Sequence, residues 1–217
     1  MPRIAVLLSG CGNRDGSELH ESVSAVIAID MKGWDTVFTA PDIPQSKSIS
    51  HLTGQPLPER NALEESARIA RGNIEPLGAG LLDSVDAIVI PGGQGASATL
   101  CDFSRRGASC EAHPDVAAFL KKAHEQGIPI AAMCIAPVLV ARVLPGISVT
   151  TGTDRSTAEK IRKMGCLHVN CSPEQTHVDR LNRIVTTPGY MNANGPYEVF
   201  RGALQMMDDL EDLISSS

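Results

Sequence analysis

The sequence predicts an α/β fold built on a doubly wound, largely parallel sheet. Short apolar runs, such as residues 4–8 and 87–90, alternate along the chain with longer segments of helical periodicity. Uninterrupted apolar runs of this length are typical of strands that are buried on both faces. Aromatic residues make up only 3% of the chain, so Ala, Val, Ile and Leu must build the core. Strands that alternate with helices from end to end favour one sheet covered by helices.

The first half of the chain begins with the strand at residues 4–8. A helix is expected from Ser17, a good N-cap residue, with Val23, Ile27 and Met31 at helical spacing and a stop at Gly33. A strand at 36–40 follows. Four prolines then divide an irregular part into an extended segment at 47–52 and a helix near 59–71. The strand at 87–90 is the clearest in the sequence, and residues 94–111 are expected to form a loop with one helical turn or more.

The second half repeats the alternation more regularly. Pro114 is placed in the first turn of a helix that Gly127 closes. The further elements expected are a strand at 129–133, a helix at 135–143, a strand at 148–151, a helix at 153–164, a hairpin over 177–186 and a final helix at 196–214. We find no repeat and no linker, so residues 1–217 are predicted to form a single domain.

Composition narrows the class of function. The formal net charge of -6 disfavours binding to nucleic acid or to anionic membranes, which leaves a small molecule as the natural partner. No stretch has the roughly 20 apolar residues of a membrane span, and the first apolar run is too short for a signal peptide. A cytoplasmic location is therefore expected, with the 6 cysteines present as thiols.

Cys134 is the strongest candidate for chemistry. An apolar strand runs directly into it and a helix is predicted to follow at once. Ala132 and Ala136, at two residues before and after, are small, as the tight turn of a nucleophile elbow requires. The carboxyl ends of strands in such a sheet are also where ligands bind. A buried, inert cysteine is the alternative interpretation.

A second feature lies after the strand at 87–90, where Pro91-Gly92-Gly93 ends the strand. If this strand neighbours the one before Cys134, the Gly93 and Ile135 N–H groups can form an oxyanion hole. Glu21 and Glu18, at the start of the first helix, are both candidates for a carboxyl group that exchanges a proton with the thiol. Their spacing alone does not choose between them. Gly92, Cys11 and Asp154 are further residues expected to line the pocket.

Metal and dinucleotide sites are not expected. Cys166, His168 and Cys171 lie close together in sequence, but no second ligand pair with zinc-like spacing exists elsewhere. Gly10-Cys11-Gly12 lacks the third glycine of a dinucleotide-binding fingerprint. His20 is expected on the surface and His177 in a structural role.

Taken together, the motifs resemble a known family. The segments Ile88-Val89-Ile90-Pro91-Gly92-Gly93 and Ala131-Ala132-Met133-Cys134-Ile135-Ala136-Pro137 are similar to those of the ThiJ/PfpI superfamily, relatives of class I glutamine amidotransferases. More specifically, Ser9-Gly10-Cys11-Gly12, the 15–21 segment, His51-Leu52-Thr53-Gly54, the 151–154 segment and the 185–191 segment resemble the ElbB branch, whose members carry the label of isoprenoid-biosynthesis proteins with an amidotransferase-like domain. The resemblance covers nearly the whole chain.

The resemblance implies a flavodoxin-like three-layer sandwich, a homodimer, and an elbow cysteine beside a protonated glutamate. Counting back from Gly33 assigns that glutamate to Glu21. It also implies a cofactor-free glyoxalase that converts glyoxal or methylglyoxal, small dicarbonyls, to hydroxy acids. In that reaction the Cys134 thiolate attacks the aldehyde to give a hemithioacetal, and Glu21 moves a proton between adjacent carbons.

The chain departs from the family at one point. Several members carry a histidine after the strand that follows the elbow, but this chain has Val149-Thr150-Thr151-Gly152 there. The departure argues against peptidase or glutaminase chemistry, which needs such a base. A non-catalytic redox sensor or regulatory protein is therefore an alternative function, because an activated Cys134 would oxidise readily. A third possibility is an amidotransferase-like domain that serves a partner enzyme.

Overall fold

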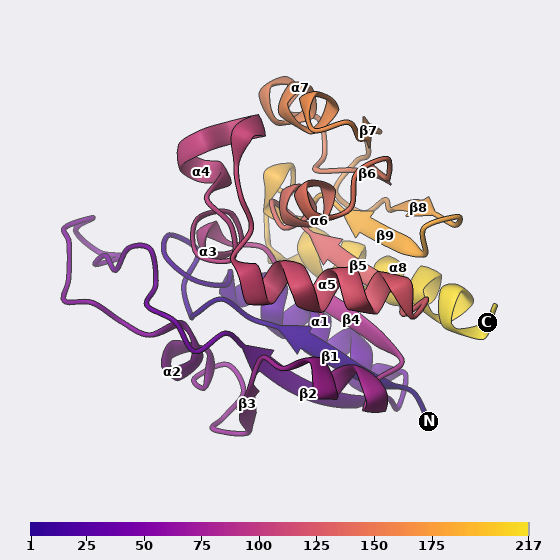
Figure 1. The fold of residues 1–217 in the computed structure, drawn as a ribbon, viewed down its shortest axis with the longest axis horizontal. Helices are drawn as coiled ribbons and strands as arrows, with labels where there is room; N and C mark the ends of the chain where they lie inside the picture. Colours follow the sequence, from indigo (N-terminus) through magenta and orange to yellow (C-terminus); the bar gives the residue numbers. More distant parts are fainter. Residues whose placement is uncertain (217) are drawn as a thin grey trace.

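The structure is a computed structural model that describes residues 1–216. Its centre is a seven-stranded sheet (Figure 1). The strands lie in the order β3 (Ile74–Pro76), β2 (Asp35–Ala40), β1 (Arg3–Leu7), β4 (Ala87–Ile90), β5 (Ile130–Met133), β9 (Ile184–Thr187) and β8 (His177–Asp179). All neighbouring strands pair in parallel except β8 and β9, which form the expected antiparallel hairpin. The predicted doubly wound α/β fold is confirmed.

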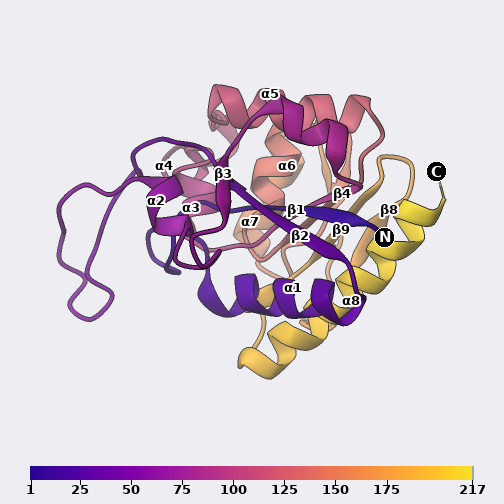
Figure 2. The ribbon, with the colours of Figure 1, turned by 90° about the horizontal axis from the view of Figure 1, so that it is seen from below.

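Helices cover both faces of this sheet (Figure 2). On one face lie α1 (Leu19–Met31) and α8 (Pro196–Ser215), and on the other lie α5 (Pro114–Glu125) and α6 (Pro137–Val143). Alternate residues of β4 enter the two cores, with Ile88 and Ile90 facing the α5 and α6 layer and Val89 the α1 and α8 layer. Because both faces are buried, the strand is apolar throughout, as the sequence indicated.

The shorter elements lie around this sandwich. They are α2 (Ala62–Ser66), η1 (Ala79–Ser84), α3 (Gln94–Ala98), α4 (Phe103–Arg106), η2 (Gly107–Ser109), β6 (Ser148–Val149), α7 (Arg155–Lys163), β7 (Leu167–His168) and η3 (Gly189–Met191). The helix expected near residues 59–71 is shorter in the structure, where α2 spans Ala62–Ser66. The strand expected at 148–151 is β6, which pairs with β7 outside the main sheet. Among residues 1–216, no helix has the length and apolar character of a membrane span.

Helix α1 differs from the prediction in its start and in its buried face. Its N-cap is Glu18, because the Ser17 hydroxyl instead accepts a hydrogen bond from the Ser9 N–H at 2.9 Å. The apolar residues Val23, Ile27 and Met31 are exposed. The buried face carries mainly small residues (Ser22, Ser24, Ala25 and Ala28), together with Glu21 and Ile29. Small side chains let α1 approach the sheet closely, which brings Glu21 inside the protein.

Helix α6 follows the elbow directly and packs into the core, and its contribution to the free energy of unfolding can be measured. Leu139 on α6 is fully buried in the core. We expect Leu139→Ala to lower the free energy of unfolding by about 2–5 kcal/mol, since it leaves a cavity that the neighbours cannot fill. Urea denaturation measures this change. Leu181→Ala, at a residue that is 92% exposed, is the matched control and should change it by less than about 0.5 kcal/mol. Equal effects of the two changes would contradict this packing.

Candidate active site

Cys134 sits on a strained turn directly after β5. Its φ is 61°, in the left-handed region that costs a residue with a side chain roughly 1–3 kcal/mol. Ala132 and Ala136 on either side are fully buried, so the tight turn has no room for larger side chains. Residues 134–136 form the turn, and α6 begins at Pro137 rather than at 135 as expected. The geometry is that of a nucleophile elbow.

Glu21 lies beneath the sulfur of Cys134 and is fully buried. One carboxyl oxygen accepts a hydrogen bond from the Gly92 N–H at 3.0 Å, and the other accepts one from the Tyr190 N–H at 2.9 Å. The Cys134 thiol donates a further hydrogen bond to the carboxylate. Glu18 does not compete for this position, because its side chain accepts from the Glu21 N–H at 2.7 Å and caps α1.

The acidity of both groups follows from burial. Loss of water raises the pKa of Glu21 from its ordinary 4.5 to about 7, against the opposing effect of its hydrogen bonds to Tyr190 and Cys134. Burial, and next the charge of Glu21, raise the pKa of the Cys134 thiol well above its ordinary value. Near neutrality Cys134 is therefore a thiol, and it donates to the Glu21 carboxyl group in the fraction of molecules in which that group is ionised. Glu21 is placed to take the thiol proton when the sulfur attacks.

Two glycines provide the space for this contact. A Cβ on Gly92 would lie 2.4 Å from the Cys134 Cβ and 2.5 Å from the Glu21 Oε2. A Cβ on Gly189 would lie 2.6 Å from the Glu21 Oε1. All three separations are shorter than real side chains allow. Any side chain at either position would push the carboxyl group away from the sulfur.

The backbone around the sulfur supplies hydrogen-bond donors. Strands β4 and β5 are neighbours, so Gly93 and Ile135 meet at the same edge of the sheet. The N–H groups of both residues point at the Cys134 sulfur, where they favour its charged form. The same pair is positioned to stabilise an oxyanion on a carbon bound to that sulfur. Gly93 also has a φ of 92° and packs against the backbone of Gly16 and Glu18, which fixes the loop before α1.

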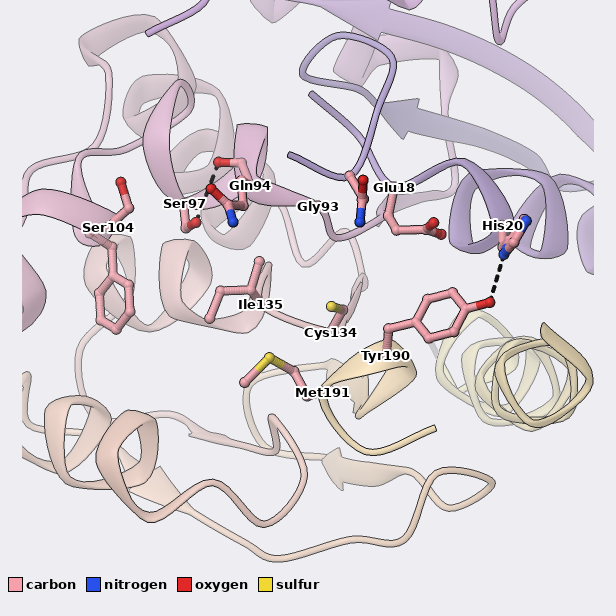
Figure 3. A pocket seen from close by; sticks show the side chains of 12 residues that line it. Glu18, His20, Gly93, Gln94, Ser97, Ser104, Cys134, Ile135, Tyr190 and Met191 are labelled. Atoms are coloured by element: carbon pink, nitrogen blue, oxygen red, sulfur yellow. Dashed lines mark hydrogen bonds between the residues drawn. The ribbon is translucent and has the colours of Figure 1, made fainter. Parts of the chain in front are cut away.

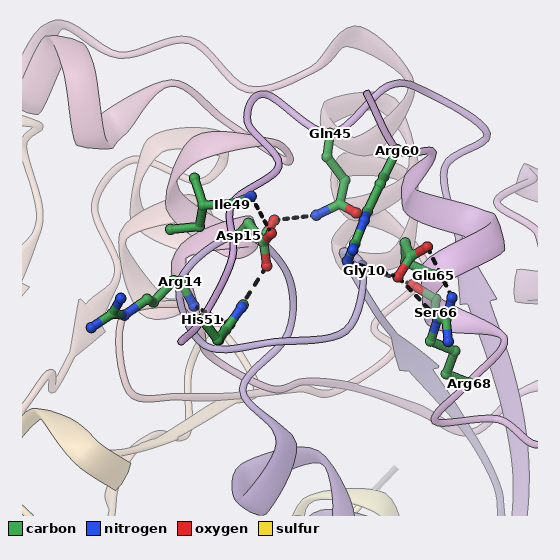
Figure 4. Close-up of polar contacts among 10 residues, drawn as sticks. All are labelled: Gly10, Arg14, Asp15, Gln45, Ile49, His51, Arg60, Glu65, Ser66 and Arg68. Carbon is green, nitrogen blue, oxygen red and sulfur yellow. Dashed lines mark hydrogen bonds and ion pairs between the residues drawn. The ribbon is translucent and has the colours of Figure 1, made fainter. Parts of the chain in front are cut away.

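Polar contacts from the 41–66 region hold that loop (Figure 4). The buried Asp15 carboxylate accepts from the Ile49 N–H at 2.9 Å, and the Gln45 amide donates to the Asp15 carbonyl. The Ser66 hydroxyl accepts from the Gly10 N–H at 2.8 Å. These contacts place Glu18 and the start of α1 against Gly92 and Gly93.

Cys134 opens into a cavity of about 750 Å³ (Figure 3). The residues that line it are Asn13, Glu18, His20, Gly93, Gln94, Ser97, Phe103, Ser104, Cys134, Ile135, Tyr190 and Met191. Glu21 is not among them, because the sulfur and the surrounding backbone cover it. The cysteine is thus the part of the pair that a ligand meets first.

His20 and Tyr190 form a part of this wall that sequence reasoning missed. The His20 Nδ1 and the Tyr190 hydroxyl are 2.6 Å apart and hydrogen-bonded (Figure 3). His20 is exposed, as expected, but it also lines the cavity. The signal available was a Pro188-Gly189-Tyr190 segment directly after an apolar strand, which places Tyr190 at the same sheet edge as Cys134.

Some residues expected to line the pocket lie elsewhere. Cys11 is half-buried beside the loop before α1, and burial raises its pKa. Asp154 is the N-cap of α7, where it accepts from the Thr157 N–H at 2.7 Å. Gly92 lies behind the sulfur rather than in the cavity wall. Neither Cys11 nor Asp154 contributes to the cavity.

The other histidines near the site are engaged away from the sulfur. His168 bonds Thr151 at 3.1 Å and His177 bonds the Ser148 hydroxyl at 2.7 Å. In the part of the chain that the structure describes, no group of three His, Cys, Asp or Glu side chains is arranged to hold a metal ion.

Comparison with known proteins finds curated relatives in which the match covers most of this chain and three quarters or more of the relative. It is 41% identical over 200 residues to glutamine amidotransferase-like class 1 domain-containing protein 3, mitochondrial, from Homo sapiens, a match that covers 87% of this chain and 75% of the relative. It is 36% identical over 222 residues to the ES1 protein homolog, mitochondrial, from Rattus norvegicus, covering 97% and 84%. No protein-family model matches the chain.

Solved structures show the same fold. An isoprenoid biosynthesis protein with amidotransferase-like domain from Ehrlichia chaffeensis superposes with a TM-score of 0.89 and 30% identity, covering 97% of this chain and 99% of that one. Drosophila melanogaster DJ-1beta superposes with a TM-score of 0.54 and 16% identity, over 99% and 96%, which shows a shared fold alone. The cytoplasmic location expected from sequence is contradicted, because these curated relatives are mitochondrial proteins.

The raised pKa of the buried Glu21 carboxyl group predicts that the free energy of unfolding depends on pH. Because the pKa of Glu21 is about 7 in the folded protein and 4.5 as an ordinary glutamate, the folded state binds this proton more tightly. The Glu21 contribution to the free energy of unfolding is therefore complete below pH 4.5 and is lost as pH rises through 7, by about 3 kcal/mol. Glu21→Gln removes this dependence, so the variant should gain stability relative to wild type between pH 5 and pH 8.

Urea denaturation of both proteins at the two pH values measures the difference. Glu64→Gln, at an exposed glutamate on α2, is the control and should follow the wild type. An equal difference between wild type and Glu21→Gln at both pH values would contradict a raised pKa at Glu21.

Proposed function

Because the chain belongs to the class I glutamine amidotransferase-like (DJ-1/ThiJ/PfpI) superfamily, in its ES1/ElbB branch, we propose that it is a cofactor-independent glyoxalase-like lyase. Its substrate would be an α-oxoaldehyde such as glyoxal or methylglyoxal and its product the 2-hydroxy acid. The observation that carries the proposal is the hydrogen bond between the buried Glu21 carboxyl group and the Cys134 thiol, whose residue lines an open cavity.

The first step of the proposed reaction forms a carbon–sulfur bond. The Cys134 sulfur attacks the aldehyde carbon while Glu21 takes the thiol proton. The aldehyde oxygen becomes an oxyanion, which the Gly93 and Ile135 N–H groups stabilise. The proton that Glu21 took then passes to this oxygen, which gives the hemithioacetal and restores Glu21 as a base. A base with a pKa of about 7 is well matched to a proton transfer near neutral pH.

The second step is an internal oxidation and reduction. The proton on the former aldehyde carbon moves to the neighbouring ketone carbon, and the hydroxyl proton of the hemithioacetal moves to the former ketone oxygen, which becomes the new alcohol. We assign this transfer to Glu21, whose carboxyl group is hydrogen-bonded to the sulfur that carries the substrate. The product is a thioester of Cys134 with the 2-hydroxy acid. Water then cleaves the thioester, so the net reaction adds one water and needs no outside oxidant.

The raised pKa of Cys134 favours turnover over redox sensing. A sensor cysteine needs a stable thiolate, but burial and Glu21 disfavour the thiolate at rest. The amidotransferase alternative is disfavoured because Val149-Thr150-Thr151-Gly152 carries no histidine and because His168 bonds Thr151 at 3.1 Å and does not line the cavity.

A homodimer is the assembly we propose, as expected from the family. Four apolar residues at four-residue spacing along the outer face of α1 support it: Leu19, Val23, Ile27 and Met31 are each at least 44% exposed. A second copy of the chain would remove this stripe from water.

Loss of the sulfur tests the proposed function. We expect the wild type to convert methylglyoxal to lactate without glutathione, and Cys134→Ala to lower kcat/KM by at least about 1,000-fold, because no covalent intermediate can form. Glu21→Gln should lower it by about 100-fold or more, since general-base catalysis is lost. Lactate formation measures all three rates.

Cys11→Ala, at a cysteine outside the cavity, is the matched control and should keep the wild-type rate. Unchanged turnover in Cys134→Ala, or no turnover in the wild type, would refute the glyoxalase proposal.

Light scattering after gel filtration tests the dimer. Ile27→Asp places a charge in the apolar stripe, so we expect it to elute as a monomer while the wild type elutes as a dimer. Leu181→Asp, at an exposed leucine on the hairpin side, should leave the dimer intact. A monomeric wild type, or a dimeric Ile27→Asp, would contradict the role of this stripe.

A further inference from the structure

The cavity is much larger than the substrates named so far require. Its volume of about 750 Å³ lies within the range of about 300–1,000 Å³ that encloses a drug-sized ligand. Methylglyoxal is a three-carbon molecule and would fill only a small part of it. With its aldehyde carbon bound to Cys134, such a molecule would leave the region beyond Ile135 unused. The geometry therefore accommodates an α-oxoaldehyde that carries a substantial substituent.

One side of the cavity offers neutral hydrogen-bonding groups. The side chains of Gln94, Ser97 and Ser104, from the α3–α4 segment, lie along this side, across from Ile135 and Met191 (Figure 3). Ser97 donates to the Gln94 carbonyl at 3.4 Å, a long bond that leaves its oxygen lone pairs available to a ligand. Asn13 adds a further amide to the lining. Hydroxyl and amide groups in a row suit a ligand with several hydroxyl groups.

The opposite side carries the apolar residues Ile135 and Met191 (Figure 3), and Phe103 from α4 also lines the cavity. A polyol chain presents both C–H groups and hydroxyl groups, so it can contact the apolar residues and the polar side chains of this cavity together. A purely aromatic or alkyl substituent would leave the polar side chains without partners, which costs binding energy.

Charge at the cavity disfavours anionic substituents. The described residues that line it include no lysine or arginine, whereas the Glu18 carboxyl group is part of the wall. Glu21 lies just beneath Cys134. Lys47 and Arg105 lie in an adjoining depression beyond Ser104, where Arg105 pairs with Asp102 at 3.0 Å and Lys47 bonds the Gln94 side chain. A carboxylate or phosphate close to the dicarbonyl would face repulsion without a cation in the wall.

We infer that the substrate class is the uncharged, polyhydroxylated α-oxoaldehydes, the kind of dicarbonyl that sugars yield on dehydration. The inference rests on the proposed function and uses the same chemistry. The aldehyde carbon bonds to Cys134, the hydroxylated chain lies between the serine side and Ile135, and one water is added overall to give a deoxy-aldonic acid.

The test compares four substrates in the full-length protein. They are 3-deoxyglucosone, methylglyoxal, phenylglyoxal as the apolar comparator, and 4,5-dioxopentanoate as the anionic comparator. We expect kcat/KM for 3-deoxyglucosone to exceed that of each of the other three by at least about tenfold, as two or more added neutral hydrogen bonds would give. Each hydroxy acid is quantified by mass spectrometry.

A double variant, Ser97→Ala with Ser104→Ala, should reduce the ratio of kcat/KM for 3-deoxyglucosone to that for methylglyoxal by about tenfold. Ser172→Ala, at an exposed serine outside the cavity, is the control and should keep the wild-type ratio. The thermal midpoint of the double variant verifies that it is folded, and Ser97→Ala alone serves if it is not.

The inference alone would be overturned if methylglyoxal were turned over as well as 3-deoxyglucosone or better, or if the ratio were unchanged in the folded serine variant. Highest activity on phenylglyoxal or on 4,5-dioxopentanoate would likewise overturn it. No turnover of any of the four by the wild type would refute the proposed function itself, and this inference with it.

Discussion

The hydrogen bond between a fully buried carboxyl group and the Cys134 thiol is the interaction on which the rest of the site depends. A lone carboxylate in this position would be costly, because it has lost its water. Three donors offset that loss: the thiol and the N–H groups of Gly92 and Tyr190. The donors do not offset it completely, so the pKa of Glu21 stays raised near neutrality. In the proposed reaction, that incomplete compensation lets Glu21 accept the thiol proton.

The backbone is shaped to allow this contact. Three segments far apart in sequence meet at one edge of the sheet: the end of β4 brings Gly92, the end of β5 brings Cys134 in a left-handed conformation, and the end of β9 brings Gly189. Gly92 and Gly189 have no side chain, and the chain bends sharply at Cys134, so the Glu21 carboxyl group fits between these segments. The strand order places β4, β5 and β9 side by side, so the same strand pairing that forms the sheet also brings the site residues together.

The sequence predicts the parts of this arrangement that depend on local pattern. Apolar runs locate β4 and β5, and the small residues around Cys134 locate the elbow. Long-range contacts leave weaker signals. Helical spacing cannot separate Glu21 from Glu18, because the choice depends on which one caps α1. His20 and Tyr190 are 170 positions apart, so their contact depends on how η3 lies against α1. The prediction that Asp154 lines the cavity is wrong, because β6 lies outside the main sheet and the loop that follows β6 leads away from the cavity.

The most direct test of the account is a carbon-13 NMR titration of the Glu21 carboxyl carbon in the wild-type protein, assigned by its absence in Glu21→Gln. Burial under Cys134 predicts a midpoint near pH 7. It also predicts a lower midpoint if the group is opened to water, as we expect in Gly92→Ala, where the added methyl group displaces the carboxyl from the sulfur. A wild-type midpoint near the ordinary 4.5 would show that the carboxyl group is solvated, and would contradict the assignment of Glu21 as the base that activates Cys134.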